Sequence, residues 1–261
     1  MKRYALIGRK IEYSFSPIIH NEIASSAGIE LEYSIMSIEP QSFIGAIDRL
    51  KNSYDGFNIT KPYKSDILPY LSKNHSVTGA VNTVSIDSGE LVGYNTDGIG
   101  FLQSLEYHNI DINGDVLILG AGGAARTLGY ELDKLTNVYI YNRTQEKVIS
   151  IIEELNLKNT ALADFNNLSP KLIINATTLG LNSKMGLPQG VKTDKLQAVY
   201  DTIYNPSCTP LLSWAKSQNI KSVNGLAMLF FQALEAQKIW NGIDLPQKNI
   251  LNILKNIEAK I

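Results

Sequence analysis

A lysine in the N-terminal part of the chain stands among side chains suited to acid and base chemistry. Lys64 ends the run Gly56-Phe-Asn-Ile-Thr-Lys-Pro-Tyr-Lys, in which Asn58 and Thr60 alternate onto one face of an extended segment. We expect Pro62 to hold the preceding residue extended and Lys64 to open a helical turn. The alternative is an ordinary surface lysine, because most lysines are solvated charges.

Two further motifs place polar side chains in turns that are flanked by glycine. Asn82 lies in Gly-Ala-Val-Asn-Thr, and Asp97 lies in Asn-Thr-Asp-Gly. The chain's histidines lie outside these motifs, which leaves Lys64 as the candidate proton donor and Asp97 as its orienting partner. Alternatively, Asn82 makes a hydrogen bond at a strand end and Asp97 is a helix N-cap. The three histidines are His20, His75 and His108.

A pair of serines precedes a proline near the start of the chain. Ser14 and Ser16 are two residues apart, which places both hydroxyls on the same side of an extended segment. Pro17 suits the first position of a helix. Two hydroxyl donors at a helix N-terminus form a small receptor for a carboxylate. The alternative is that Ser16 only caps the helix.

The middle of the chain carries a glycine fingerprint typical of dinucleotide-binding proteins. The apolar run from Val116 to Leu119 leads into Gly-Ala-Gly-Gly-Ala-Ala, the G-x-G-x-x-A form of the motif. Gly120 allows a tight turn, Gly122 lets the backbone approach a pyrophosphate, and Ala125 lets the helix pack closely on its strand. A strand and helix that only pack closely through a glycine would have a similar sequence. The residues after the next strand are therefore needed to decide whether the motif binds a dinucleotide.

Those residues favour NADP over NAD. An acidic residue at this position would bind the ribose 2′-hydroxyl of NAD, whereas this chain has Asn142, Arg143 and Thr144, with Lys147 one helical turn further on. A guanidinium group binds phosphate through two charge-assisted hydrogen bonds, so the set fits a 2′-phosphate. The alternative makes Thr144 an ordinary N-cap and Arg143 a solvated loop charge.

Composition narrows the class of protein. The 261 residues carry 24 Lys and Arg against 25 Asp and Glu, and nothing in this balance argues for nucleic acid as a partner. Cys208 is the only cysteine and no Cys/His cluster is present, so we expect neither an internal disulfide nor a metal site. No apolar run approaches the ~20 residues that span a bilayer, so we expect a cytoplasmic protein without a membrane partner.

Short apolar runs alternate with helical patterns along most of the chain. Strand-like runs include those from Tyr4 to Ile7 and from Val138 to Tyr141, and the spacing of Val148, Ile151 and Leu155 is that of one helical face. This alternation predicts an α/β protein with parallel sheets that helices cover on both faces. After Leu226 two helical patterns follow without a strand between them, and we expect them to pack on the first domain.

Together these motifs resemble the shikimate dehydrogenase family over essentially the whole chain. Several motifs in a fixed order are far more specific than any one of them. The chain departs from the family pattern at Thr178, Leu181 and Ala227, and none of these changes removes an acid or base group. The resemblance also rests on Asn175-Ala-Thr177, Tyr204-Asn-Pro206, Gly225 and the run from Met228 to Ala233.

The resemblance implies an NADP-dependent oxidoreductase that reversibly reduces 3-dehydroshikimate to shikimate in aromatic amino-acid (chorismate) biosynthesis, with Lys64 and Asp97 as catalytic residues. No metal is implied. The implied substrate-binding residues are Ser14, Ser16, Asn58, Thr60, Lys64, Asn82, Asp97, Tyr204 and Gln232. The implied cofactor-binding residues are Gly120, Ala121, Gly122, Gly123, Ala124, Asn142, Arg143, Thr144, Lys147, Thr202 and Gly225.

The resemblance further implies two domains. Residues 1–97 and 233–261 would form an N-terminal α/β substrate-binding domain, completed by C-terminal helices that return to it, and residues 98–232 a Rossmann-type NADP-binding domain. We expect a monomer or homodimer whose partners are small molecules. Two alternatives stay open: a quinate/shikimate dehydrogenase that uses NAD, and a catalytically silent nucleotide-sensing protein on the same fold.

Overall fold

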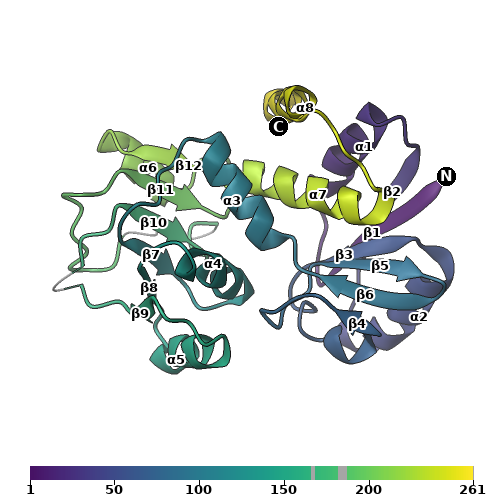
Figure 1. Ribbon diagram of the computed structural model, residues 1–261, viewed down its shortest axis with the longest axis horizontal. Helices are drawn as coiled ribbons and strands as arrows, with labels where there is room; N and C mark the ends of the chain where they lie inside the picture. The colour runs from purple at the N-terminus through teal and green to yellow at the C-terminus, as the bar shows by residue number, and fades with distance from the viewer. Residues whose placement is uncertain (166–167, 182–186, 261) are drawn as a thin grey trace. The chain divides into compact units, whose positions relative to one another are not determined.

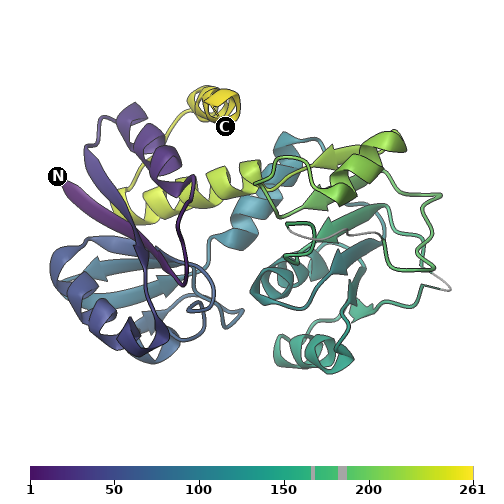
Figure 2. The ribbon, with the colours of Figure 1, turned by 180° about the vertical axis from the view of Figure 1, so that it is seen from behind.

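The chain forms two α/β units in a computed structural model that describes residues 1–165, 168–181 and 187–260. The first unit comprises Met1–Gly100 and Leu229–Ile261, and the second comprises Phe101–Met228 (Figures 1 and 2). The units therefore divide at residues 100 and 228 rather than at the expected 97 and 232. Both divisions fall inside continuous helices, α3 (Asp97–Tyr107) and α7 (Leu226–Asn241), so no linker marks them in the sequence.

The first unit is built on a mixed six-stranded sheet with the strand order β2-β1-β3-β5-β6-β4. Strand β1 pairs parallel with β2 and β3, and β4 with β6, while β5 pairs antiparallel with β3 and β6. The strands are β1 (Lys2–Gly8), β2 (Leu31–Ser37), β3 (Gly56–Ile59), β4 (Lys73–Asn74), β5 (Thr83–Asp87) and β6 (Glu90–Tyr94).

This sheet differs from the parallel sheet that the sequence predicts. The reason is a two-residue turn, Ser88-Gly89, in which both residues have positive φ, 51° and 80°. Such a turn matches the twist of two antiparallel strands and folds β6 directly back on β5. Strand β6 has only a weak signal in the sequence, because its apolar residues are few and are interrupted by Gly93.

Helices cover both faces of this sheet, and the alternation of side chains assigns each strand residue to a face. Ala5 and Ile7 of β1 pack with α2 (Phe43–Ser53) on one face. Tyr4 and Leu6 pack with Trp240 of α7 on the other. The C-terminal helices α7 and α8 therefore return to the first unit, as the sequence predicts. The remaining helices are α1 (Ser16–Ser26), η1 (Pro40–Ser42), η2 (Leu68–Tyr70) and α8 (Gln247–Lys260).

The second unit has a six-stranded sheet with the order β12-β11-β10-β7-β8-β9, in which all the pairings of the described strands are parallel. This is the Rossmann order, with the reversal of strand order between β7 and β10. The strands are β7 (Val116–Leu119), β8 (Val138–Tyr141), β9 (Thr160–Leu162), β10 (Leu172–Asn175), β11 (Ala198–Asp201) and β12 (Lys221–Val223).

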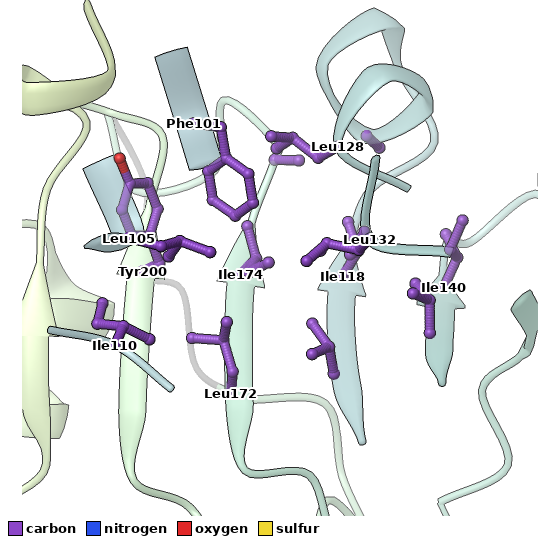
Figure 3. Packing of buried hydrophobic residues seen from close by; sticks show 14 of the residues in the cluster. Phe101, Leu105, Ile110, Ile118, Leu128, Leu132, Ile140, Leu172, Ile174 and Tyr200 are labelled. Atoms are coloured by element: carbon purple, nitrogen blue, oxygen red, sulfur yellow. The ribbon is translucent and has the colours of Figure 1, made fainter. Parts of the chain in front are cut away.

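Alternate strand residues of the second unit build a core on each face of the sheet. On one face they pack against α3, α4 (Gly123–Asp133) and α5 (Gln145–Glu154), and on the other against α6 (Pro210–Ser217). Each fully buried Leu or Ile contributes about 1.5–3 kcal/mol of hydrophobic free energy. Figure 3 shows the first core, in which strand residues Ile118, Ile140, Leu172 and Ile174 lie against Phe101, Leu105, Leu128 and Leu132.

Candidate active site

The first unit brings together the candidate proton donor and its expected partner. Lys64 Nζ lies 2.5 Å from Asp97 Oδ2, and the two side chains are 21% and 13% exposed. The other carboxylate oxygen, Asp97 Oδ1, accepts a hydrogen bond from Asn82 Nδ2 at 2.7 Å. We call Lys64 and Asp97 the lysine–aspartate pair. It holds an ammonium group in a fixed orientation while leaving part of it accessible.

Three chain segments position this pair. Lys64 lies in the turns that follow β3. The Ile67 backbone N–H donates to the Tyr63 backbone oxygen at 3.2 Å, so the expected helical turn forms around Lys64, although it leads only to the short helix η2. Asn82 directly precedes β5, and Asp97 begins α3. Asp97 does not act as the N-cap of α3. The Asn95 side chain accepts a hydrogen bond from the Asp97 backbone N–H at 3.0 Å. The Asp97 carboxylate instead binds Lys64 and Asn82.

Polar side chains from β5, from the segment before α3 and from α7 surround Asn82. Its Nδ2 lies 3.0 Å from Thr96 Oγ1 and 3.4 Å from Gln232 Oε1, and its Oδ1 accepts the Thr83 hydroxyl at 3.0 Å. Gln232 donates to the backbone carbonyl of Leu229 at 2.9 Å, which fixes its amide. The structure thus brings Gln232 and Asn82 together, although 150 positions separate them in the chain.

The two serines form a second cluster in the same unit, which we call the serine pair (Ser14 and Ser16). The Ser14 hydroxyl donates to Ser16 Oγ at 3.0 Å and accepts from the Ser16 backbone N–H at 3.1 Å. Both residues are buried. The N-cap of α1 is Phe15, which makes no side-chain cap, so Ser16 does not cap the helix. The two hydroxyls therefore lie side by side, with the proton of Ser14 directed at Ser16 Oγ.

Asn58 lies between the serine pair and Asn82, and its amide is fully engaged inside the protein. Its Oδ1 accepts from the Tyr33 hydroxyl at 2.7 Å, and its Nδ2 donates to the backbone oxygen of Asn82 at 3.1 Å and to Thr83 Oγ1 at 2.9 Å. Both amide hydrogens are used, so the geometry favours support of neighbouring groups over direct contact with a substrate. Thr60 follows β3 and is half-buried, next to Gly8.

A histidine outside the sequence motifs lies directly behind this cluster. His20 on α1 stacks on Tyr33 with ring centroids 4.3 Å apart, and its Nδ1 lies 2.9 Å from Gln237 Nε2. Burial lowers the pKa of His20 to about 3, an effect that the nearby Asn58 side chain only partly offsets. The ring is therefore neutral at physiological pH. Burial also raises the pKa of Tyr33 well above its ordinary value, although a hydrogen bond with Ser16 opposes this.

In the second unit, the glycine turn follows β7 at the reversal of strand order. Gly120 has φ of +113°, and a Cβ there would lie 2.7 Å from Thr177 Cγ2, so only glycine fits. Gly122 is the N-cap of α4 and has no side chain, so the first backbone N–H groups of Gly123 and Ala124 have no side-chain cap. A helix N-terminus built in this way binds phosphate. Ala121 lies within the same turn.

The cationic residues after β8 face solvent. Arg143, Thr144 and Lys147 are exposed, and within the described ranges the side chains of Arg143 and Lys147 make no ion pair or hydrogen bond. Asn142 Nδ2 donates to the Thr144 backbone oxygen at 2.9 Å, which orders the turn. Thr144 occupies the N-cap position of α5 but makes no side-chain cap. Both cations are thus available to a phosphate.

The remaining expected site residues also lie in the second unit. A Cβ on Gly225 would lie 2.2 Å from the backbone oxygen of Thr202, so these two segments touch through their backbones. Tyr204 follows β11 and is half-buried, on a different unit from the serine pair. The described residues contain no group of three His, Cys, Asp or Glu side chains that could hold a metal ion. None of the described helices has both the length and the apolar character needed to span a bilayer.

The two units together define a class of protein. A Rossmann-type sheet with a phosphate-binding glycine turn, in a chain that also carries a partly buried lysine–carboxylate pair, is typical of dinucleotide-dependent oxidoreductases. A family profile described as the shikimate dehydrogenase substrate binding domain matches residues 6–84. A shikimate dehydrogenase (NADP(+)) of Methanocaldococcus jannaschii is 40% identical over 260 residues, which cover 93% of this chain and 92% of that protein. The chain belongs to the shikimate dehydrogenase family.

Solved structures agree with this assignment. The shikimate 5-dehydrogenase of Thermus thermophilus, crystallised with NADP(H) and shikimate, is 30% identical with a TM-score of 0.88, and the match covers 98% of this chain and 100% of that one. The shikimate 5-dehydrogenase of Listeria monocytogenes, crystallised with shikimate and NAD, is 28% identical with a TM-score of 0.84, covering 97% and 96%. The family and the two-unit fold expected from the sequence are both confirmed.

Proposed function

We propose that the protein catalyses the NADPH-dependent, reversible reduction of 3-dehydroshikimate to shikimate, a reaction of aromatic amino-acid biosynthesis. The observation that carries the proposal is the lysine–aspartate pair, because it supplies a fixed, partly exposed ammonium group in the unit that also carries the carboxylate receptor. Relatives named shikimate dehydrogenase (NADP(+)) over almost the whole chain support the choice of substrate and cofactor.

The lysine–aspartate pair performs the proton transfer. Reduction of a ketone places negative charge on the carbonyl oxygen, which must receive a proton as that charge develops. Lys64 Nζ donates this proton in the reducing direction and accepts it from the alcohol in the oxidising direction. Asp97 holds the ammonium group through Oδ2 and is itself held by Asn82. When bound, a nicotinamide cofactor supplies the hydride.

The other polar residues bind and orient the substrate. The hydroxyls of Ser14 and Ser16 hold the ring carboxylate. Tyr204, on the second unit, is assigned to substrate binding by the family motifs alone. Thr60, Asn82 and Gln232 hold the ring hydroxyls, and Asn58 keeps its neighbours in place through its three hydrogen bonds. These roles rest on the family motifs together with the burial and contacts of the side chains in the first unit.

The second unit binds the cofactor. The uncapped N-terminus of α4 and the glycines from Gly120 to Gly123 receive the pyrophosphate, and the structure supports this because a Cβ at Gly120 would fill the turn. Arg143 and Lys147 bind the 2′-phosphate, with Asn142 and Thr144 in the same turn. Thr202, Gly225, Ala121 and Ala124 line the cofactor. The first unit is thereby assigned mainly to the substrate and the second to NADP.

One assay tests the proposal and its main alternative. Steady-state rates are measured for shikimate and quinate, each with NADP⁺ and with NAD⁺. We expect the highest kcat/KM for shikimate with NADP⁺. A preference for quinate or for NAD⁺ would instead establish the quinate/shikimate alternative, and nucleotide binding without turnover in all four assays would establish the sensor alternative. Retention of both Lys64 and Asp97 favours an enzyme.

Two further expectations, the oligomeric state and the cytoplasmic location, remain predictions. Size-exclusion chromatography with light scattering distinguishes a monomer from a homodimer. Cell fractionation tests the cytoplasmic location.

A further inference from the structure

A buried carboxylate lies at the carboxyl edge of the Rossmann-type sheet, and the proposed function gives it no role. Asp201 is the last residue of β11 and is buried. It accepts hydrogen bonds from Asn175 Nδ2 at 2.9 Å, from the Ile203 backbone N–H at 3.0 Å and from the Thr209 hydroxyl at 2.7 Å. Burial raises the pKa of Asp201, and these hydrogen bonds oppose the rise. The carboxylate therefore joins three segments of the chain at one point.

The first donor, Asn175, orders the loop that follows β10. Asn175 is the last residue of β10 and lies opposite Asp201 in the parallel register. Its Oδ1 accepts from the Thr177 backbone N–H at 3.0 Å and from the Thr177 hydroxyl at 2.7 Å, and its Nδ2 also donates to the Leu179 backbone oxygen at 3.1 Å. The Asn175 amide cannot turn without breaking its hydrogen bond to Asp201. The carboxylate thus sets the orientation of this amide and, through it, the conformation of the loop.

This loop packs directly on the glycine turn. Leu119, the last residue of β7, lies opposite Asn175 on β10, so the glycine turn and the loop leave the sheet next to each other. A Cβ on Gly120 would lie 2.7 Å from Thr177 Cγ2 and 3.2 Å from the Ala176 backbone oxygen. Ligands of such sheets bind at the carboxyl ends of the strands, where the strand order reverses. A displaced Thr177 would therefore alter the wall of the turn that we assign to the pyrophosphate.

The segment after β11 is tied to the same carboxylate. Its Ile203 backbone N–H donates to Asp201, and the Gly225 backbone N–H donates to the Ile203 oxygen at 3.1 Å. The Thr202 backbone N–H donates to the Asn175 backbone oxygen at 3.0 Å, and a Cβ on Gly225 would lie 2.2 Å from the Thr202 oxygen. Thr202 and Gly225, which the proposed function places against the cofactor, are thus linked to Asp201 through the backbone.

We propose that Asp201 is a positioning residue for the dinucleotide, whose carboxylate holds the loops after β10 and β11 in the conformation that binds NADP(H). Asp201 acts through Asn175 and Ile203, and because it is buried it does not itself touch the cofactor. The inference rests on the proposed function, which assigns the cofactor to the second unit. Loops that adopt the binding conformation only about a tenth of the time weaken binding about tenfold.

The test measures dissociation constants for NADP⁺ and NADPH by isothermal titration calorimetry, without substrate. Asp201→Ala leaves three donors without their acceptor, and we expect it to raise both constants by about 5- to 50-fold. Asp201→Asn keeps an oxygen for Asn175 and Ile203, and its amide can donate to Thr209 Oγ1. We expect this variant to restore both constants to within about threefold of wild type, because the hydrogen bonds are retained.

Asp133 provides a matched control in the same unit. It is also buried and also accepts three hydrogen bonds, from the backbone N–H groups of Lys158 at 3.0 Å and Asn159 at 2.8 Å and from the Thr160 hydroxyl at 2.6 Å. Thr160 begins β9, so this cluster lies at the amino edge of the parallel sheet, opposite to the edge at Asp201. Asp133→Ala should lower the free energy of unfolding in urea but leave both dissociation constants within about twofold of wild type.

Three outcomes overturn the positioning role even when the wild-type protein binds NADP⁺ and oxidises shikimate. The first is a folded Asp201→Ala variant with wild-type dissociation constants. The second is an equal loss of affinity in Asp133→Ala, which would make the effect one of general stability. The third is a loss in Asp201→Asn as large as in Asp201→Ala, because the negative charge rather than the hydrogen bonds would then be responsible.

Thr209 decides if Asp201→Ala does not fold. Thr209→Val removes one hydrogen bond to the Asp201 carboxylate, and Thr209→Ser keeps it. Weaker NADP⁺ binding in Thr209→Val that Thr209→Ser restores supports the positioning role, and unchanged binding in Thr209→Val overturns it. A wild-type protein that binds neither NADP⁺ nor NADPH overturns the proposed function and this inference with it.

Discussion

The ammonium nitrogen of Lys64 lies 2.5 Å from Oδ2 of Asp97, although 33 positions separate the two residues in the chain. The β5–β6 hairpin accounts for this proximity. It returns the chain to the end of the sheet where it started, so that Asn82 before β5 and Asp97 after β6 meet beside the turns that carry Lys64.

Removal of the Lys64 amine should abolish most of the proton transfer. We expect Lys64→Ala to lower kcat for shikimate oxidation by roughly 10² to 10⁴ with a smaller change in KM, the loss typical of a general acid or base. Lys73→Ala, which removes an exposed lysine of the same unit, is the control and should leave kcat unchanged. A Lys64→Ala variant with near wild-type kcat would falsify the catalytic assignment.

Arg143 should distinguish the two forms of the cofactor. A hydrogen bond to a charged group contributes about 1.5–3 kcal/mol, so Arg143→Ala should weaken NADPH binding by roughly 10- to 100-fold. NADH lacks the 2′-phosphate, and its dissociation constant should change little. Fluorescence titration with both cofactors measures the difference, and an equal loss for both would remove Arg143 from the 2′-phosphate site.

Two glycine substitutions should change stability in opposite directions. In Gly225→Ala the new Cβ would lie 2.2 Å from the backbone oxygen of Thr202, so the backbone must move at a cost of about 1–3 kcal/mol. In Gly45→Ala, on α2, nothing lies within 4 Å of the new Cβ, and alanine favours the helix by about 1 kcal/mol. Urea unfolding measures both changes. Equal effects of the two substitutions would contradict the close contact at Gly225.

His20 should make the first unit sensitive to acid. Its folded pKa of about 3 lies below the value of about 6.5 in an unfolded chain, so the unfolded state binds the extra proton first. The free energy of unfolding is unaffected above pH 6.5. It should then fall by about 1.4 kcal/mol for each pH unit between 6.5 and 3.

The measurement compares urea unfolding of wild type and of His20→Gln across this pH range. In His20→Gln, the free energy of unfolding should fall less steeply as the pH is lowered. His75→Gln, at an exposed histidine, is the control and should show the wild-type dependence on pH. Identical slopes in wild type and His20→Gln would show that the imidazole is protonated without unfolding.

The sequence predicts motifs better than it predicts the contacts among them. The glycine turn and the residues after β8 were recognised because their spacing along one strand–turn–helix unit is local. A capping role for Ser16 was plausible from the same local information, and the structure does not show it. Local preferences cannot reveal that Ser14 already occupies the Ser16 backbone N–H.

The residues missed by the sequence share a physical reason. Tyr33 and His20 lie on β2 and α1 with the burial of ordinary core aromatics, and only tertiary packing places their polar atoms beside Asn58 and Gln237. Thr83 and Thr96 stand inside recognised motifs, so the signal for them was present. When two motifs meet in the fold, a polar residue next to a site residue in either motif is a candidate for the same hydrogen-bond network.

The two-residue Ser88-Gly89 turn sets the register of the β5–β6 hairpin, and with it the positions of the residues at the opposite end of the hairpin. With Asp87 opposite Glu90, the ladder ends with Thr83 opposite Tyr94, and the flanking Asn82 and Asp97 come within bonding distance. One extra residue in that loop would slide one strand past the other and turn each of its side chains to the wrong side. The length of this exposed turn therefore helps to place Asn82 and Asp97, although the turn lies at the opposite end of the hairpin.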